Sequence, residues 1–471
     1  MNTKFLSSIV FLFILSTVSA QMGSQELLLK ASAYELDITI DYENERMEAI
    51  CDLIVTNPTE KAQKTVPLLL HRLLRIASVK DAEGNSVKFK QEVVSFEDWE
   101  KYQVNHIQLE LDQPLRKTES MEFTINYGGY LVGYTETGMN YVKDHINPDF
   151  TIIRPDCNAY PMLGYPSFEV NDMAGFESFE YKATVKVPDS LIVANGGRLI
   201  NHSIQNGKAS FTYESIMPSW RIDIAIARYN TLKDDRLSVF AFPEDSVGAD
   251  RILSASRSTW NLYEKWWGKL DENVEFKIIE IPEGWGSQAD VTCILQSTPA
   301  FKETGKSTEL YHEISHLWNI KSNDRFDPRW NEGLAMFLQY LTQEKLEEKS
   351  GILEEKVATF MNRIKKSKQF DAVPMIDFGK EQLTGNSYIT GMIMFYILYD
   401  LLGEMKFNEL IKEARKQYKS IGATTQQFFE IASKSSSKNL NLLLEDWMFS
   451  TQYVDLIRSE LSIKELIERY R

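Results

Sequence analysis

The sequence predicts a multidomain protein with an antiparallel β half followed by a mainly helical half. In much of the first 242 residues, apolar and polar residues alternate with a period of two, as they do in half-buried strands. From about residue 249 onward, apolar residues recur at helical spacing instead. The 471 residues also exceed the roughly 100 to 200 residues usual for one domain, so we expect two or three domains.

The chain begins with a segment typical of a secretory signal. Lys4 supplies a positive charge, residues 5–15 form an apolar core, and residues 18–20 are small, as at a cleavage site. The apolar core is shorter than the roughly 20 residues that span a bilayer, so a retained membrane anchor is the weaker alternative. We therefore expect residues 1–20 to be removed and the mature protein to be soluble, either in a periplasm or secreted.

Charge and cysteine content narrow the classes of partner and scaffold. Loss of Lys4 with the signal would change the formal net charge from −15 to −16, which argues against nucleic acid or an anionic membrane as partner. Neutral or basic substrates are slightly favoured. The three cysteines, Cys51, Cys157 and Cys293, cannot all pair, so a disulfide scaffold is excluded. Asn201 begins an NHS sequon, which matters only in a eukaryotic secretory pathway.

The predicted β domain covers residues 21–242. Its clearest strands are 34–42 and 47–55, joined by the turn ENER. Further strands are predicted at residues 107–111, 121–127, 179–187, 209–213, 222–226 and 237–242. Alternation of apolar and polar residues is typical of antiparallel sheets that bury one face.

The second predicted domain covers residues 243–457, followed by a short helical tail at 458–471. Residues 249–270 read as a helix whose aromatic residues fall on one face, which favours a packed core over a ligand cage: Trp260, Tyr263, Trp266 and Trp267. A strand is expected at 274–281, and helical patterns dominate after residue 341.

The densest metal-ligand chemistry lies in the motif HEISH. On a helix, His312 and His316 stand one turn apart on the same face, so both imidazoles can bind one zinc ion. Glu313 lies beside the metal but off the line of ligands, where its carboxylate can take a proton from water. The chain has only six His, which makes this spacing unlikely by accident.

The third ligand is predicted to be Glu332, in the segment WNEGLA. A helical stripe that includes Trp330 and Leu334 buries this segment, and a buried carboxylate needs a cation or another partner. Asp324 and Asp327 are the rival ligands, and a surface Glu near a helix start is the simpler alternative. Gly333 would weaken the helix, which a close approach of two helices would explain.

With these motifs the chain resembles the gluzincin zinc aminopeptidases related to alanyl aminopeptidase and leukotriene hydrolase. NEGLA is similar to their NEGFA, although fifteen residues separate His316 from Glu332 where the family usually has eighteen. The resemblance implies a saddle-like N-terminal sheet domain, a thermolysin-like catalytic domain and one zinc ion. It also implies a tyrosine that stabilises the oxyanion. Tyr388 matches that position, although Thr390 replaces the family's Lys and the chain has 21 Tyr.

The largest departure from the family lies in residues 286–290, GSQAD. The family carries GxMEN there, on an edge strand whose Glu binds the α-amino group of the substrate, and here Ala289 stands in place of that Glu. Ile152 likewise stands where the family often has a substrate-binding Gln. Gly286, Ser287 and Gln288 are still expected to pair with substrate backbone.

The sequence therefore predicts a secreted zinc metallopeptidase with altered recognition of the substrate's amino terminus. Its substrate would be a peptide or protein. One alternative is a true aminopeptidase in which Asp290 or Glu283 holds the α-amino group. Another, from a different class, is a peptide-binding protein without turnover, and the intact base Glu313 argues against it.

Overall fold

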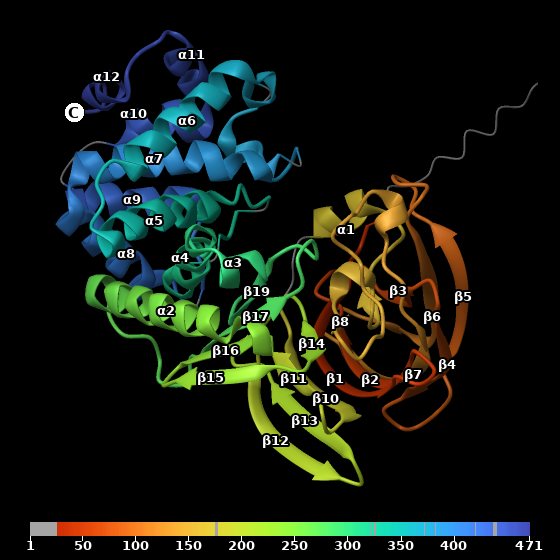
Figure 1. The fold of residues 1–471 in the computed structure, drawn as a ribbon. Helices are drawn as coiled ribbons and strands as arrows, with labels where there is room; N and C mark the ends of the chain where they lie inside the picture. Colours follow the sequence, from red (N-terminus) through yellow and green to blue (C-terminus); the bar gives the residue numbers. More distant parts are fainter. Residues whose placement is uncertain are drawn as a thin grey trace, which may run out of the picture.

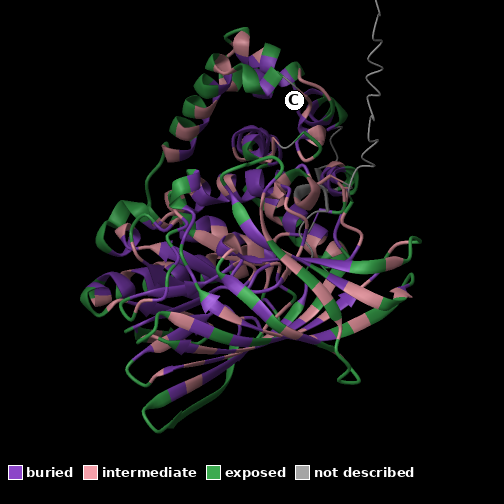
Figure 2. Ribbon diagram, turned by 90° about the vertical axis from the view of Figure 1, so that its right-hand side faces the viewer, coloured by how far each residue is buried: buried purple, intermediate pink, exposed green. Residues whose placement is uncertain are grey.

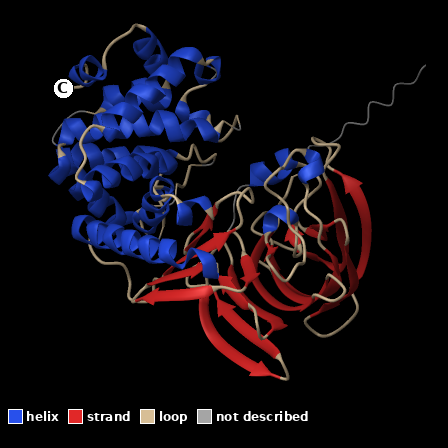
Figure 3. Ribbon diagram, viewed as in Figure 1, coloured by secondary structure: helices blue, strands red, loops and turns tan. Residues whose placement is uncertain are grey.

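The computed structural model describes residues 26–174, 178–320, 322–324, 326–371, 373–381, 383–419, 421–436 and 440–471. A β-rich half and a helical half lie side by side (Figure 1), and strands and helices are largely segregated between them (Figure 3). The predicted fold class is thereby confirmed. The signal segment, residues 1–20, lies outside the described residues and stays a prediction.

The described part of the β half is built from three sheets. The largest has the strand order β12-β13-β10-β1-β2-β7-β4. Its strands are β1 (Lys30–Asp41), β2 (Arg46–Thr56), β4 (Leu74–Asp81), β7 (Ser120–Tyr130), β10 (Glu180–Pro188), β12 (Arg198–Gln205) and β13 (Lys208–Glu214). Alternate residues of β1, such as Leu36 and Ile38, are fully buried, as the period of two predicts. One pair in this sheet, β1 with β10, is parallel.

Two smaller sheets complete this half. The first has the order β5-β6-β3-β9, formed by β5 (Lys88–Ser95), β6 (Gln103–Leu115), β3 (Gln63–His71) and β9 (Met162–Leu163). The second has the order β11-β14-β8, formed by β11 (Ile192–Asn195), β14 (Ile224–Ala227) and β8 (Thr151–Ile153). The second sheet faces the helical half across a separate apolar cluster that includes Ile152 and Leu295. Ile152 is therefore a core residue at this junction.

The fourth sheet belongs to the helical half and has the order β15-β16-β17-β19-β18. Its strands are β15 (Asn230–Asp234), β16 (Leu237–Ala241), β17 (Phe276–Ile281), β18 (Gln288–Asp290) and β19 (Cys293–Ser297). Because β16 pairs in parallel with β17, the strand predicted at 237–242 joins this sheet and not those of the β half. Leu237 and Val239 pack into the core of the helical half, which explains the difference. β18 lies at the edge of the sheet.

The helices pack on one another and on this sheet, and their buried faces turn inward (Figure 2). They are α2 (Ser246–Trp267), α3 (Pro299–Lys302), α4 (Glu309–Ser315), α5 (Trp330–Glu347), α6 (Ile352–Lys366), α7 (Ser387–Leu402), α8 (Glu404–Tyr418), α9 (Thr425–Ser436), α10 (Asn441–Leu444), α11 (Gln452–Arg458) and α12 (Ile463–Glu468), while α1 (Phe168–Ala174) lies in the β half. Trp260, Tyr263 and Trp267 of α2 are buried in the core, as expected. In α12, Leu466 and Ile467 join the same core.

Helices α5 and α7 cross at a contact between two glycines. A Cβ atom added to Gly333 would lie 2.5 Å from the Cα of Gly391, closer than real atoms approach. The close approach that the sequence suggested for Gly333 is therefore present, and it brings the start of α7 beside the start of α5.

Two further expectations concern cysteines and membranes. All three cysteines are buried and none forms a disulfide. Within the described ranges, no helix combines the length and apolar character needed to cross a bilayer.

Candidate active site

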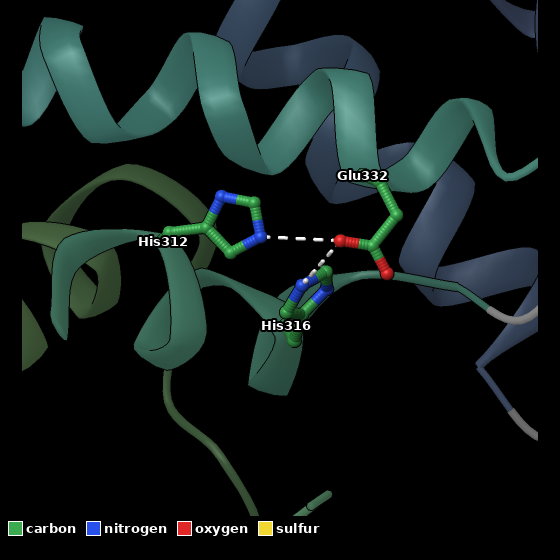
Figure 4. Close-up of side chains that lie close together, drawn as sticks. All are labelled: His312, His316 and Glu332. Carbon is green, nitrogen blue, oxygen red and sulfur yellow. Dashed lines mark hydrogen bonds and ion pairs between the residues drawn. The ribbon is translucent and has the colours of Figure 1, made fainter. Parts of the chain in front are cut away.

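The side chains of His312, His316 and Glu332 converge on one point, as Figure 4 shows. The Oε2 atom of Glu332 lies 3.1 Å from Nε2 of His312 and 3.5 Å from Nε2 of His316. Helix α4 carries His312, whereas His316 begins the single 3-10 turn that follows it. Glu332 comes from the first turn of α5. The structure thus brings together the three residues that the sequence predicted as ligands.

The geometry of these three atoms fits a zinc ion. Ligand atoms placed tetrahedrally at about 2.0–2.1 Å from zinc lie roughly 3.3 Å apart, close to the separations seen here. Two imidazoles and one carboxylate are also the donor set of many catalytic zinc sites, which keep a fourth position for water or substrate. The amide nitrogen of Asn319 lies 3.1 Å from Nδ1 of His316. With the amide turned by 180°, its oxygen would accept a hydrogen bond from Nδ1–H of a ring that binds zinc through Nε2.

The rival acidic residues are engaged elsewhere. Asp324 accepts hydrogen bonds from the backbone N–H and the hydroxyl of Thr425, at the start of α9. Asp327 accepts from the backbone N–H of Arg329. Neither belongs to the cluster of possible metal ligands formed by the described residues.

Arg329 is a site residue that the sequence reasoning missed. Its guanidinium donates to Oε1 of Glu332 over 2.7 Å, so that Oε2 alone faces the two histidines. The guanidinium also lies over the ring of Tyr388, 6.0 Å from its centre. Arg329 stands three residues before the predicted ligand Glu332, a spacing that places two side chains about one helical turn apart. This spacing was the signal in the sequence that could have indicated their contact.

The charges of the site are interdependent. Burial opposes ionisation of Glu332, but His316, His312 and Arg329 outweigh it and hold the pKa of Glu332 well below its usual range. Burial also disfavours the charged form of His316, yet Glu332 raises the pKa of that ring above its usual value. A Glu that stays ionised is the form that binds a cation.

The predicted catalytic residues border the ligands. Burial raises the pKa of Glu313, which makes its carboxylate a better proton acceptor than a solvated Glu. The ring of Tyr388 stacks on that of His312, with centres 5.9 Å apart and planes inclined by 11°. Burial and then Glu332 raise the pKa of Tyr388, so its hydroxyl keeps the proton that a hydrogen-bond donor needs. Thr390 points back into its helix and donates to the carbonyl of Asn386.

The predicted substrate-binding segment leads into the edge strand. Gly286 has a positive φ of 72° and lies so close to Tyr141 that a Cβ would clash with it. Ser287 is exposed. Gln288 begins β18, and its side-chain oxygen accepts from Arg221 of the β half over 3.0 Å. The strand at which we expect substrate pairing is therefore present, and it begins at Gln288.

The structure places Ala289 and Asp290 on opposite faces of β18. Ala289 pairs with Ile294, which belongs to the core shared with helix α4. Asp290 is on the other face, where its carboxylate accepts from the hydroxyl of Ser219 over 2.6 Å. Because successive residues of a strand point to opposite sides, Asp290 does not take the place of a carboxylate at Ala289. Glu283 is exposed in the loop before the strand.

Two histidines from α4 and the turn after it and a glutamate from α5 lie next to the half-buried Glu313, and this arrangement is of the zinc metallopeptidase class. Residues 292–447 match the model of the Peptidase family M1 domain. This part of the chain thus matches the M1 family, and the predicted resemblance to the gluzincin zinc aminopeptidases is confirmed.

Solved structures show the same fold. The M1 zinc metallopeptidase from Deinococcus radiodurans superimposes with a TM-score of 0.66 at 14% identity, covering 90% of this chain and 94% of that one. A mutant of that enzyme, solved with a Tyr-Ser-Ala substrate, superimposes with a TM-score of 0.63 at 14% identity over the same shares of the two chains.

Curated relatives are distant in sequence. Glutamyl aminopeptidase of Rattus norvegicus is 20% identical over 459 residues, which is 89% of this chain and 47% of the relative. A probable aminopeptidase 2 of Sulfurisphaera tokodaii is 20% identical over 335 residues, which is 65% of this chain and 42% of the relative. The chain thus spans less than half the length of these relatives.

Proposed function

We propose that the protein is a zinc-dependent peptidase that hydrolyses peptide bonds and recognises the substrate's amino terminus differently from its relatives. The convergence of His312, His316 and Glu332 beside Glu313 is the observation that supports it most directly. When bound, zinc supplies a Lewis acid that polarises the scissile carbonyl and lowers the pKa of water.

The chain's own residues perform the remaining work. Glu313 takes a proton from the attacking water and passes it to the leaving amino group. The hydroxyl of Tyr388 donates a hydrogen bond to the oxygen on which negative charge develops. Among the described residues β18 is the last strand of its sheet, and its free edge offers backbone groups to a peptide beside the residues that would hold the metal.

The amino terminus would be recognised differently because the cleft face of β18 carries no carboxylate. Ala289 ends in a methyl group, and the carboxylate of Asp290 turns toward Ser219. A true aminopeptidase that uses Glu283, which is exposed close to the strand, is the remaining form of the alternative. We further propose that the protein is secreted or periplasmic, on the strength of residues 1–20, and that its partners are peptides and not nucleic acid. N-terminal sequencing of the protein recovered outside the producing cell tests the secretion proposal.

Incubation of the zinc-loaded protein with a mixed peptide library, followed by mass spectrometry of every cut, tests this function. We expect zinc-dependent cleavage that Glu313→Gln reduces on the order of 100 to 10,000-fold while zinc stays bound, because Gln cannot accept the proton of water. If the wild type cleaves nothing and still binds peptides, the non-catalytic binding protein is the correct interpretation.

A further inference from the structure

Helix α4 carries a second carboxylate, Glu309, which is exposed and lies one turn before the proposed general base Glu313. Glu309 precedes His312 by three residues and Glu313 by four, so it lies on the same side of the helix as both. Burial is the main cause of the raised pKa of Glu313, and the charge of Glu309 adds to it, so the two carboxylates are neighbours.

Glu309 is tied to the strands that border the cleft. Nε2 of Gln296, on β19, donates to Oε2 of Glu309 over 3.3 Å and lies 3.5 Å from the hydroxyl of Ser287. Gln296 is only 3% exposed, and its other amide atom, Oε1, has no hydrogen-bond partner among the described residues. The buried amide therefore holds Glu309 beside the entry to β18.

The face of the strand that carries this contact is the cleft face. Gln296 is two residues after Ile294, the partner of Ala289, so all three side chains lie on the side of the sheet that faces α4. On this face Ala289 adds only a methyl group, and through Gln296 the carboxylate of Glu309 is held next to the same two strands.

The carboxylate of Glu309 is also available to a ligand. It is exposed, and no Lys, Arg or His side chain within the described residues forms an ion pair with it. A surface Glu near a helix start would be favoured by the helix dipole alone. That explanation does not account for the buried Gln296 that joins this carboxylate to the strand.

We propose that Glu309 is a specificity residue that selects peptides with a positive charge close to the scissile bond. This inference rests on the proposed peptidase function. The recognised group is an ammonium or a guanidinium, which either the free α-amino group or a basic side chain can supply. A carboxylate that accepts hydrogen bonds from such a cation favours it over a neutral group by on the order of ten to a hundredfold in kcat/KM.

The test uses matched peptides with Lys, norleucine or Glu at each position next to the cleaved bond, each with a free or an acetylated amino terminus. The zinc-loaded wild type, Glu309→Gln and Glu309→Lys are compared by kcat/KM. Glu272→Gln, which makes the same charge change at an exposed position before β17, is the matched control.

We expect one of the positive charges to raise wild-type kcat/KM by on the order of ten to a hundredfold. Glu309→Gln should abolish that preference and keep cleavage of the uncharged peptide, Glu309→Lys should reverse it toward acidic peptides, and Glu272→Gln should leave it unchanged. If acetylation removes the preference, the recognised cation is the α-amino group. If replacing Lys by norleucine removes it, the recognised cation is the basic side chain.

Two results would overturn the proposal. If the wild type cleaves charged and uncharged peptides with equal kcat/KM, it has no subsite for a positive charge. If the preference for positive charge survives in Glu309→Gln, it arises from a residue other than Glu309. Cleavage of the uncharged acetylated peptide reports on the peptidase function separately. Its absence together with the absence of all other cleavage overturns the proposed function, and this inference with it.

Discussion

At the proposed zinc site, neighbouring side chains fix the orientation of two of the three proposed ligands. Arg329 occupies Oε1 of Glu332, and the Asn319 amide lies against Nδ1 of His316. Partners of this kind orient the ligands and tune their affinity for the metal. The convergence of the proposed zinc ligands was predictable because their types and spacing are specific. Arg329 acts only through a contact that depends on the path of the loop before α5.

Loss of a ligand is expected to remove the metal. His312→Ala and His316→Ala each leave two protein ligands, so most of the zinc should be absent after purification and dialysis. Metal analysis of the purified variants measures this, with wild type expected to hold one zinc per chain. Asp324→Asn, which alters a rival that binds Thr425 instead, should keep its zinc, and loss of zinc from that variant would show that the ligand set is wrong.

Loss of the ligand's partner should weaken binding without abolishing it. Arg329→Gln frees Oε1 of Glu332 and removes a positive charge from beside it, so the carboxylate is held less firmly. We expect zinc affinity to fall by about 10 to 100-fold, measured by competition with a chelator of known affinity. Arg329→Lys should recover part of the lost zinc affinity, because the Lys ammonium restores the positive charge but not the planar guanidinium that donates to Glu332. Equal zinc affinity in wild type and Arg329→Gln would contradict this role.

At the scale of whole elements, the active site depends on how α5 and α7 cross. Gly333 follows the ligand Glu332, and Gly391 lies three residues after Tyr388, so their contact sets the distance between ligand and oxyanion donor. The sequence indicated a close approach at Gly333 but could not identify its partner, because that residue is 58 positions further along the chain. Likewise, the strand predicted at 237–242, which is β16, was assigned to the β half although it pairs with β17, since alternation reveals a strand and not its neighbour.

Gly333→Ala is expected to disturb both stability and activity. The new methyl group would meet backbone atoms of α7, and overpacking of this kind costs typically 1–3 kcal/mol. Thermal unfolding should show the loss of stability, and kcat should fall more than KM rises because Tyr388 moves away from the reacting carbonyl. Gly385→Ala, where an added Cβ meets nothing within 4 Å, is the control. Unchanged kcat in a folded Gly333→Ala variant would rule out this spacing role.

At the scale of the whole molecule, buried charge makes stability depend on pH. Glu280 lies in β17 with no exposed surface, and one of its carboxylate oxygens has no partner among the described residues. Burial raises the pKa of Glu280 from 4.5 to about 8, and nearby Asp245 adds to the effect. Between these values the folded protein binds more protons than the unfolded chain, so this group lowers stability as pH rises from about 4.5 to 8.

The variant Glu280→Gln should remove this dependence. Because Gln stays neutral, the variant should gain stability relative to wild type as pH rises, on the order of 1–4 kcal/mol by pH 9. Urea unfolding of both proteins from pH 4.5 to 9 measures the difference. A stability difference that stays constant over this range would show that Glu280 does not take up a proton on folding.

The whole-molecule architecture was the easiest level to predict, and the junction between its halves the hardest. The change from period two to helical spacing marks two kinds of structure, and both are present. Two arginines buried at the junction, Arg154 and Arg221, gave no such signal, because isolated Arg and Asp residues in a sequence usually lie at the surface. Their partners come from segments far apart, and only the assembled fold brings them together.

These arginines also determine which parts of the chain can be exchanged between relatives without loss of function. Arg154, paired with buried Asp144, donates to the carbonyl of Trp285 just before the edge strand, and Arg221 holds Gln288 within it. The strand that would receive substrate is thus supported by side chains of the neighbouring half. A chimaera that joined this catalytic half to the β half of a relative would lose those supports even if both halves folded. Recombination should therefore preserve function only when the two halves are exchanged together, or when the arginines travel with the strand.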